Sequence, residues 1–343
     1  MPTYYVRGSK AKVVLEDRDF IAAGGEKKVY AKGGTAYCVY HEPAAAIPAA
    51  KIRELAALSS DSVVVPTAEL LDANKQHVGE VMAFVADSYS PFPPNAKPMV
   101  LCQLITNAFR RKQKVENRHI ADVTNRILDI TRYCHSKGAV LVDPNDANWL
   151  VRHDLGEVYL IDTSCIQTAS YPGTAIKPAI RDWTVSHFDQ NTDWFSIAVV
   201  LGWLWVGIHP YMAEHPRWKG FTSAQALEPR VRENWSFFRS GTEFNRACRP
   251  IADVPTALRD WLRAVLDEGQ RCPGPTNCGT PAPTAVRVVV PAASSHRIEL
   301  KELETFAADV RTVFGQYVTT DSNYPDAVIA TTPRFAMPVA AQQ

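Results

Sequence analysis

The sequence predicts an α+β fold, in which a small β-rich lobe is followed by a larger helical lobe. Two observations support this prediction. Residues 10 to 85 contain short runs of β-favouring residues separated by glycine pairs and turns, whereas apolar residues recur at helical spacing from about residue 98. The chain of 343 residues can bury a large core, and its 46% apolar and 21% charged residues are typical of a globular protein.

The first lobe, residues 1 to 86, is expected to form a five-stranded sheet with one helix. Residues 10 to 42 alternate β-rich runs with two glycine pairs, which is typical of three antiparallel strands joined by tight turns. A helix is expected after Pro48, where Ala and Leu recur at helical spacing. Residues 63 to 71 and 77 to 85 flank a polar turn and predict a second hairpin.

The second lobe, residues 87 to 272, is expected to be mainly helical, with three short strands between residues 139 and 162. A tail, residues 273 to 343, begins with a Pro-rich linker. In the tail a strand is expected at 285 to 290 and a helix at about 298 to 315. The helices predicted in the second lobe are at residues 98 to 113, 117 to 137, 192 to 206 and 255 to 267.

Charge and hydropathy argue against several classes of protein. Lys plus Arg (37) nearly equals Asp plus Glu (36), so no overall field attracts nucleic acid or an anionic membrane, and neither is expected as a partner. The longest apolar run, residues 197 to 208, is shorter than the roughly 20 residues that cross a bilayer. Irregularly spaced cysteines and a start without a secretory signal predict a cytoplasmic protein.

An unusual set of polar residues lies in the apolar stretch from residue 139 to residue 162. Asp143 and Asn148 stand five positions apart in "AVLVDPNDANWLV", and Asp162 ends the strand-like run "VYLID". Each acid alone suits a turn at the end of a strand. The five-residue step from Asp to Asn, followed by a second acid at a strand end, favours a functional site over two unrelated turns.

These motifs, in this order, resemble those of the protein kinase-like superfamily over roughly residues 12 to 272. "LVDPNDAN" is similar to the H-R-D-x-x-x-x-N catalytic loop, and "YLIDTSC" takes the place of the D-F-G strand. The resemblance implies a bilobal protein kinase-like fold in which Asp143 accepts the proton of a substrate hydroxyl. It also implies that Asn148 and Asp162 bind the Mg²⁺ that bridges the phosphates of ATP.

The stretch "GGEKKVY" looks like a glycine-rich loop, in which the amides of Gly24 and Gly25 would lie over the phosphates. The third strand has Cys38 where kinases carry the lysine of V-A-I-K. The with-no-lysine kinases also carry cysteine there and take their lysine from the strand of the glycine-rich loop. Lys27 has the matching position, and strand alternation directs Lys28 to the opposite face. Lys27 is therefore expected to bind phosphate.

The resemblance also implies a partner for this lysine and a pocket for adenine. Glu54, in the helix after Pro48, is the acid expected to pair with Lys27, whereas Lys51 one turn earlier is expected at the surface. The run "VMAFV" resembles the hinge that lines adenine through apolar packing and backbone hydrogen bonds. The residues expected to contact the base are Met82, Ala83 and Val85.

Four other positions take roles from the resemblance. Asp193 corresponds to the aspartate that braces the catalytic-loop backbone. Arg271 corresponds to an arginine that pairs with the acid of the A-P-E segment, but Ala179 stands where that acid is expected. Asn145 replaces the catalytic-loop lysine, which predicts weaker stabilisation of the γ-phosphate and slow turnover.

The sequence therefore predicts a Ser/Thr protein kinase that uses ATP and Mg²⁺ and acts on a protein substrate. Two alternatives stay open. Because the thiol of Cys38 cannot supply the lost cation, one alternative is a pseudokinase that serves as a nucleotide-binding scaffold. The other is a small-molecule phosphotransferase of the aminoglycoside or choline type, which has the same Asp-to-Asn step and against which the "HPY" motif argues.

Overall fold

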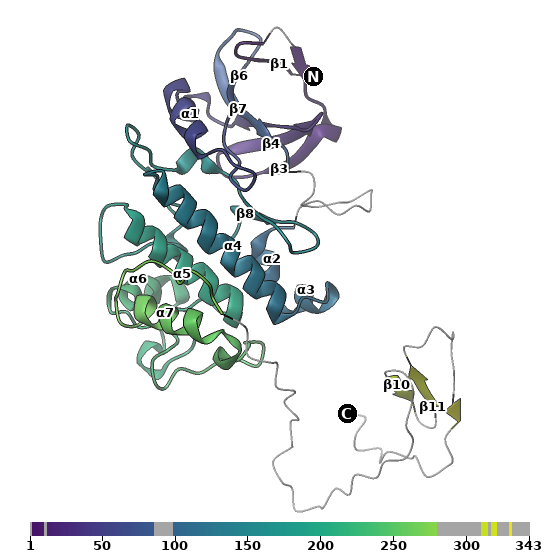
Figure 1. Cartoon of the computed structure of the whole chain (residues 1–343), viewed down its shortest axis with the longest axis vertical. Coiled ribbons are helices and arrows are strands. Elements are labelled where there is room, and N and C mark those ends of the chain that lie inside the picture. Colours follow the sequence, from purple (N-terminus) through teal and green to yellow (C-terminus); the bar gives the residue numbers. More distant parts are fainter. Residues whose placement is uncertain are drawn as a thin grey trace, which may run out of the picture. The chain divides into compact units, whose positions relative to one another are not determined.

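The structure is a computed structural model, which describes residues 2–9, 12–85 and 99–279 and the backbone of three short strands between residues 310 and 330. The chain divides into two compact units, Met1–Ala285 and Val286–Gln343. The first unit contains an antiparallel sheet followed by a helical part (Figure 1). This mixed arrangement of a sheet and helices agrees with the predicted α+β class.

The sheet has seven strands in the order β2-β1-β6-β7-β5-β4-β3. Two more strands form than the sequence predicts, because β1 was not expected and residues 10 to 42 contain four strands instead of three. The predicted hairpin of β6 and β7 forms. The strands are β1 (Thr3–Val6), β2 (Lys12–Val14), β3 (Phe20–Ala23), β4 (Lys27–Lys32), β5 (Thr35–Tyr40), β6 (Ala68–Leu71) and β7 (His77–Ala83).

The register of the central strands determines which side chains share a face. Val29 on β4 lies opposite Cys38 on β5, and Cys38 lies opposite Glu80 on β7. Residues directly opposite in an antiparallel pair point to the same side of the sheet, and residues two apart in a strand do so as well. Lys27, two before Val29 and opposite Tyr40, therefore shares this face with Glu80.

One helix, α1 (Ala49–Leu55), accompanies the sheet and begins directly after Pro48, as predicted. The helical part contains α2 (Leu101–Ile105), α3 (Asn107–Lys112), α4 (Asn117–Ser136), α5 (Gln190–Val206), α6 (Ser223–Arg232) and α7 (Thr256–Leu266). The helix predicted at residues 98 to 113 is two helices, since Thr106 caps α3 by accepting a hydrogen bond from Phe109 N. Helix α6 was not predicted from the sequence.

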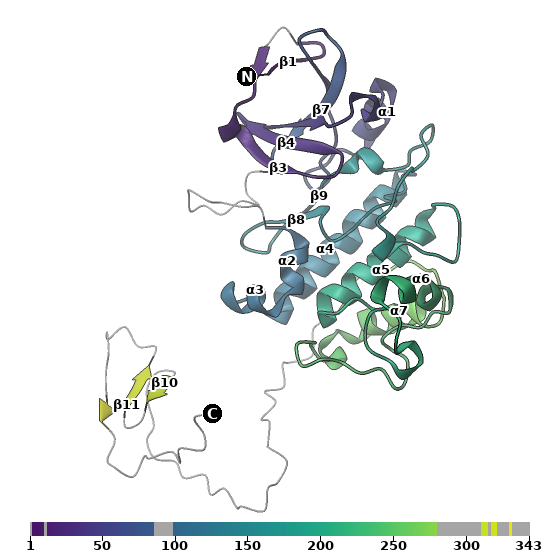
Figure 2. The same ribbon diagram turned by 180° about the vertical axis from the view of Figure 1, so that it is seen from behind.

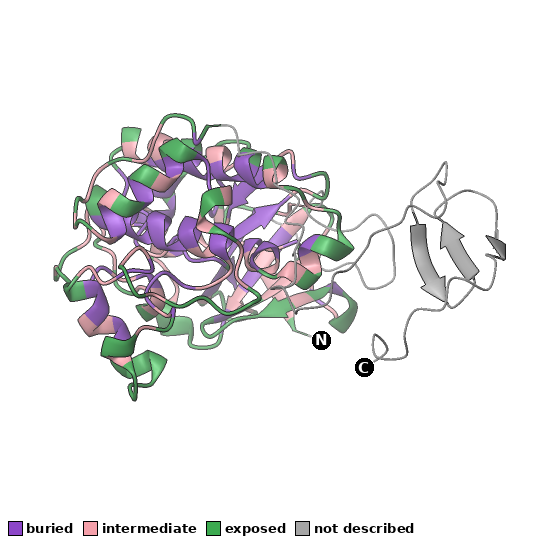
Figure 3. Cartoon of the chain, turned by 90° about the horizontal axis from the view of Figure 1, so that it is seen from below, coloured by how far each residue is buried: buried purple, intermediate pink, exposed green. Residues whose placement is uncertain are grey.

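Helix α5 is the centre of the helical part. It contacts α2, α4 and α7, and all but three of its residues are buried, which explains why its sequence is apolar on every side. The two views in Figures 1 and 2 place α4 and α5 side by side, and Figure 3 shows buried positions concentrated inside this unit. No helix in the described part of the chain is both long and apolar enough to cross a bilayer.

A two-stranded ladder, β8 (Trp149–Val151) and β9 (Val158–Leu160), joins the sheet region to the helices. Leu160 forms a parallel bridge with Val63, which precedes β6, and Val64 N donates to Leu160 O at 2.9 Å. The third strand predicted in this stretch is reduced to a single bridge between Val140 and Gln167. The ladder and this bridge hold in place the backbone of the segment that contains Asp143 and Asp162.

The second unit contains a three-stranded antiparallel sheet of β10 (Val310–Phe314), β11 (Tyr317–Thr320) and β12 (Ile329–Ala330). The helix predicted at 298 to 315 is therefore wrong for its last turn, where the β-branched and aromatic residues of "VRTVF" favour a strand. The rest of that helix and the strand predicted at 285 to 290 lie outside the described residues.

Candidate functional site

A cavity of about 630 Å³ lies between the β3–β4 turn, α1 and the segments that follow Val142 and β9. Its lining includes five of the residues predicted from the sequence to act together: Gly24, Gly25, Lys27, Asp143 and Asp162. The structure therefore brings the glycine pair, one lysine and both acids to one place. Residues far apart in the chain meet here because the start of β4, the loop before β8 and the segment after β9 line the same cavity.

Lys27 is surrounded by acceptors. Its Nζ lies 2.6 Å from Glu80 Oε1 and 2.7 Å from Asp162 Oδ1, and it donates to Ser164 Oγ at 2.7 Å. Two of its three N–H donors make hydrogen bonds, to Glu80 and Ser164, and the ion pair with Asp162 completes its surroundings. Burial alone would lower the pKa of Lys27, but Glu80 and Asp162 raise it well above its ordinary value. Lys27 is therefore a buried cation.

The prediction that strand alternation separates Lys27 from Lys28 is confirmed. Lys27 is 8% exposed and Lys28 is exposed to solvent. Cys38 occupies the strand position where a kinase carries lysine, and burial raises the pKa of its thiol to about 12. Cys38 is therefore a neutral neighbour of Lys27 in this structure.

The predicted partner of Lys27 is wrong. Glu80 on β7, not Glu54 on α1, pairs with it, and Ser164 Oγ donates to the same Glu80 oxygen at 2.8 Å. Glu54 Oε2 instead accepts from Ser170 N at 3.2 Å. The reason is the rotation of the short helix α1, which presents Lys51 to the cavity. A buried acid within the apolar run "HVGEVMA" was the sequence signal that could have identified Glu80.

Lys51 was also expected at the surface, and this expectation is wrong. Its residue is only 6% exposed, it lines the cavity, and Nζ donates to the backbone oxygen of Ser164 at 2.7 Å. Ser164 therefore accepts hydrogen bonds from both lysines, from Lys27 at its hydroxyl and from Lys51 at its carbonyl. The cavity contains two ammonium groups where the sequence predicted one.

The carboxylate of Asp143 is held by two donors. Lys177 N donates to Oδ1 at 3.0 Å and Asn145 Nδ2 donates to Oδ2 at 2.9 Å. Burial raises the pKa of Asp143, although these two hydrogen bonds oppose the rise, and the charge of Asp162 adds to it. Lys177 also extends its ammonium to Asp146 Oδ1 at 2.7 Å, so one residue contacts two acids of the loop.

The backbone before Asp143 is braced by Asp193, as predicted. Asp193 accepts hydrogen bonds from Leu141 N at 2.6 Å and Val142 N at 2.9 Å, and Val142 has a φ of 68°. Burial raises the pKa of Asp193, and its hydrogen bond with His135 opposes that rise. Ala179 does stand where an acid was expected, and the acid that pairs with Arg271 is instead Asp182.

Asn148 and Asp162 were predicted to hold magnesium. Asn148 O accepts from Ile161 N at 2.9 Å, so the β8–β9 ladder brings Asn148 beside the residue that precedes Asp162. Asn148 Nδ2 donates to Asp143 O at 2.9 Å, which leaves the side-chain oxygen to act as a ligand. The described residues contain no group of three or more His, Cys, Asp or Glu arranged around a metal position. Asn148 is not among the residues that line the cavity, so a Mg²⁺ position shared with Asp162 stays a prediction.

The residues predicted to contact adenine are not brought to this cavity. Met82 packs in a small apolar cluster, with Val85 at its margin, whereas Ala83 is exposed. The N–H of Phe84, between them, donates to Gly34 O at 3.1 Å. The buried residues of the cluster are Ala36, Cys38, Val64, Met82, Leu150 and Tyr159, which come from β5, β7, β8, β9 and the segment before β6.

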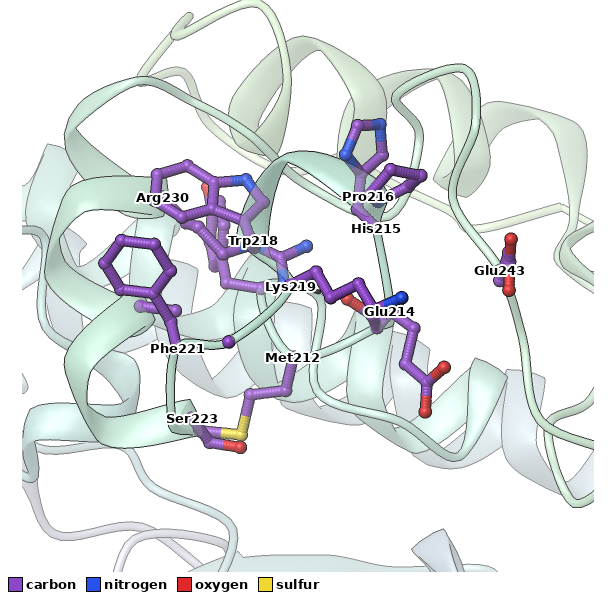
Figure 4. Close-up of a pocket in the computed structure, with 14 residues that line it drawn as sticks. Met212, Glu214, His215, Pro216, Trp218, Lys219, Phe221, Ser223, Arg230 and Glu243 are labelled. Carbon is purple, nitrogen blue, oxygen red and sulfur yellow. Dashed lines mark hydrogen bonds between the residues drawn. The ribbon is translucent and has the colours of Figure 1, made fainter.

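A second cavity of about 560 Å³ lies beside α6, among the residues drawn in Figure 4. Its walls combine Trp218 and Phe221 with Arg230, whose Nη1 donates to Ala213 O at 2.8 Å. No residue predicted from the sequence to be functional lines it. The first cavity, which gathers acids and lysines, is therefore the candidate site.

A comparison with protein-family models finds no match for this chain, and a comparison with curated proteins finds none either. The residues of the first cavity are therefore the basis on which a function is assigned.

Proposed function

We propose that the chain is a divergent protein kinase-like phosphotransferase, which uses Mg-ATP to phosphorylate a Ser or Thr hydroxyl of a protein. The observation that carries the proposal is that Asp143, Asp162 and Lys27 line one cavity whose edge is formed by Gly24 and Gly25. Phosphoryl transfer depends mainly on positioning and charge compensation, and acids, a cation and backbone amides are suited to supply both.

The architecture supports a bilobal kinase-like fold. A sheet with the single helix α1 precedes a helical part, and the β8–β9 ladder connects them beside the cavity. Asp193 braces the loop that carries Asp143, which is the role that the resemblance implies for it.

In the proposed reaction, Asp143 accepts the proton of the substrate hydroxyl while that oxygen bonds to the γ-phosphorus, and the bond from this phosphorus to its bridging oxygen breaks as ADP leaves. Two hydrogen bonds, from Lys177 N and Asn145 Nδ2, fix the orientation of its carboxylate for this step. Asn148 and Asp162 would hold Mg²⁺, which when bound neutralises charge on the phosphates. Lys27 keeps Asp162 in position through the contact at 2.7 Å.

We assign adenine to the small apolar cluster around Met82. Apolar packing with a few backbone hydrogen bonds is what a site for a planar base requires. Val85 lies at the margin of this cluster and Ala83 is exposed beside it. Entry of the base therefore requires the cluster to open, which predicts that Met82→Ala increases the affinity for adenosine.

A pseudokinase is the second candidate, and one observation favours it. Two hydrogen bonds and the ion pair with Asp162 surround the ammonium of Lys27, so a phosphate would have to displace one of these protein groups. A protein with this closed network could bind a nucleotide without transferring its phosphate.

Incorporation of radiolabelled phosphate from ATP into a general protein substrate separates these candidates. The wild type should incorporate label, and Asp143→Ala and Asp162→Ala should not. Asp154→Ala, which changes an acid in the exposed β8–β9 turn, is the matched control and should remain active. Label that survives both substitutions would contradict the proposed site. ATP binding without any incorporation would favour the pseudokinase.

A further inference from the structure

Lys51 is a buried cation without a carboxylate partner. It is 6% exposed, and among the described residues no Asp or Glu oxygen lies within ion-pair distance of its Nζ. Its hydrogen bond to the backbone oxygen of Ser164 accounts for one of its three donors. A buried charge is costly unless it is paired, so an anion in the cavity would stabilise this ammonium.

The two lysines of the cavity differ in what they can still bind. Lys27 has Glu80, Asp162 and Ser164 around its Nζ, so a ligand would have to displace one of these groups. Lys51 has two donors left and lines the same cavity. Burial lowers the pKa of Lys51, and the more distant carboxylates of Glu80 and Glu54 oppose this effect only in part. An anion that enters the cavity would therefore be bound by Lys51 without displacing a protein group.

We propose that Lys51 binds a phosphate group of the nucleotide, and that Lys27 is a positioning residue that holds Asp162. The proposal rests on the proposed function, because it names the cation that meets the polyphosphate in that same cavity. In this arrangement, α1 supplies the lysine that binds phosphate, and β7 supplies the acid that neutralises the lysine of β4. The resemblance implied a phosphate-binding lysine on the strand and its partner acid on the helix.

Calorimetric titration with Mg-ATP, adenosine and inorganic tripolyphosphate tests the proposal on the full chain. Lys51→Gln should weaken binding of Mg-ATP and tripolyphosphate by about tenfold or more, as the loss of a hydrogen bond to a charged group does. Its affinity for adenosine should be unchanged, and Lys51→Arg should restore most of the loss. Lys28→Gln, on the exposed face of β4, is the control and should bind as the wild type does.

A structural role for Lys51 would give a different pattern. Thermal unfolding without ligand should be unchanged or stabilised in Lys51→Gln, because an unpaired buried charge is removed. Destabilisation together with equal loss of adenosine and ATP binding would overturn the proposal. In the wild type, tripolyphosphate should also protect Lys51 from chemical acetylation while Lys28 stays reactive. Absence of this protection would overturn it without relying on a variant.

The outcomes also separate this proposal from the proposed function. If the wild type binds Mg-ATP and Lys51→Gln binds it equally well, the role of Lys51 is rejected and nucleotide binding stands. If the wild type binds tripolyphosphate through Lys51 but does not bind ATP, the anion site stands and the nucleotide function is rejected. Binding of neither compound by the wild type rejects both.

Discussion

Arg271 and Asp182 form a bidentate ion pair, which joins the end of the helical part to the segment that precedes α5. Arg271 Nε lies 2.6 Å from Asp182 Oδ2, and Nη2 donates to Oδ1 at 3.2 Å. Arg271 Nη1 also donates to Val265 O at 2.7 Å, so its guanidinium is fixed on two sides. The pair anchors a segment that also carries Lys177, whose N–H holds Asp143.

Breaking this pair should strongly destabilise the protein. Arg271→Gln leaves Asp182, which is 4% exposed, without its counter-charge, and removing one partner of a buried pair costs about 3–5 kcal/mol. Urea denaturation should detect the change in the free energy of unfolding. Arg232→Gln disrupts the exposed pair with Glu228 on α6 and is the control, with an expected effect of about 0.5 kcal/mol or less. Equal effects of the two substitutions would contradict the assignment.

The same pair should make stability depend on acid pH. Burial raises the pKa of Asp182, but hydrogen bonds from Arg271 and Thr184 outweigh it and hold the pKa below its ordinary value of 3.8. A carboxyl with a lowered folded-state pKa adds stability that is fully present above its unfolded pKa and is lost as pH falls through the folded pKa. Urea denaturation from about pH 6 to about pH 3 should therefore show a steeper loss for the wild type than for Asp182→Asn. Parallel curves would argue against this linkage.

Substitutions of Lys27 and Lys28, the first two residues of β4, should differ sharply in their effect on phosphate transfer. Lys27→Met leaves Glu80 and Asp162 without their shared cation and should reduce the rate by about 100-fold or more, given the cost of an unpaired buried charge. Lys28→Met changes an exposed residue of the same strand and should leave the rate nearly unchanged. Initial rates of label transfer from ATP measure both. Equal loss in both variants, or in neither, would reject the assignment.

The environment of Asp143 predicts the acid limb of the pH–rate profile. Burial raises the pKa of Asp143 above 3.8, and the hydrogen bond from Asn145 opposes that rise. Since the base must be ionised to accept a proton, kcat/KM should fall as pH drops through this pKa. Asn145→Ala should move the limb to higher pH. Asn74→Ala, in the exposed turn between β6 and β7, should not move it. A limb that stays in place in Asn145→Ala would exclude Asp143 as the titrating base.

Local patterns in the sequence were sufficient for much of the fold. The glycine pair between β4 and β5 predicted their hairpin, apolar periodicity predicted α4 and α7, and a continuous apolar run predicted α5, because these elements depend on neighbours within a few residues. The inward direction of Lys27 followed from strand alternation in the same way. Features of this kind can be identified before any long-range contact is known.

The partners of Lys27 depend on contacts between distant parts of the chain. Glu80 reaches Lys27 only because β7 pairs with β5 and β5 pairs with β4 in a particular register. Lys51 faces the cavity because of the rotation of a helix of seven residues, too short for its periodicity to specify which side is buried. Asp182 replaces an acid expected three positions earlier, a shift that depends on the path of the backbone before α5.

Glu80 and Glu54 offer a direct comparison of the two assignments for the partner of Lys27. Glu80 is 0% exposed and contacts Lys27 at 2.6 Å, Ser164 at 2.8 Å and Tyr40 at 3.4 Å. Glu80→Gln should therefore lower the free energy of unfolding by about 3–5 kcal/mol and slow phosphate transfer, because Lys27 loses one of its two counter-charges. Glu54→Gln should change both quantities little, since Glu54 binds a loop N–H near the surface. Urea denaturation and label transfer measure the two variants side by side, and the reverse ranking would mean that the helix acid is the functional partner after all.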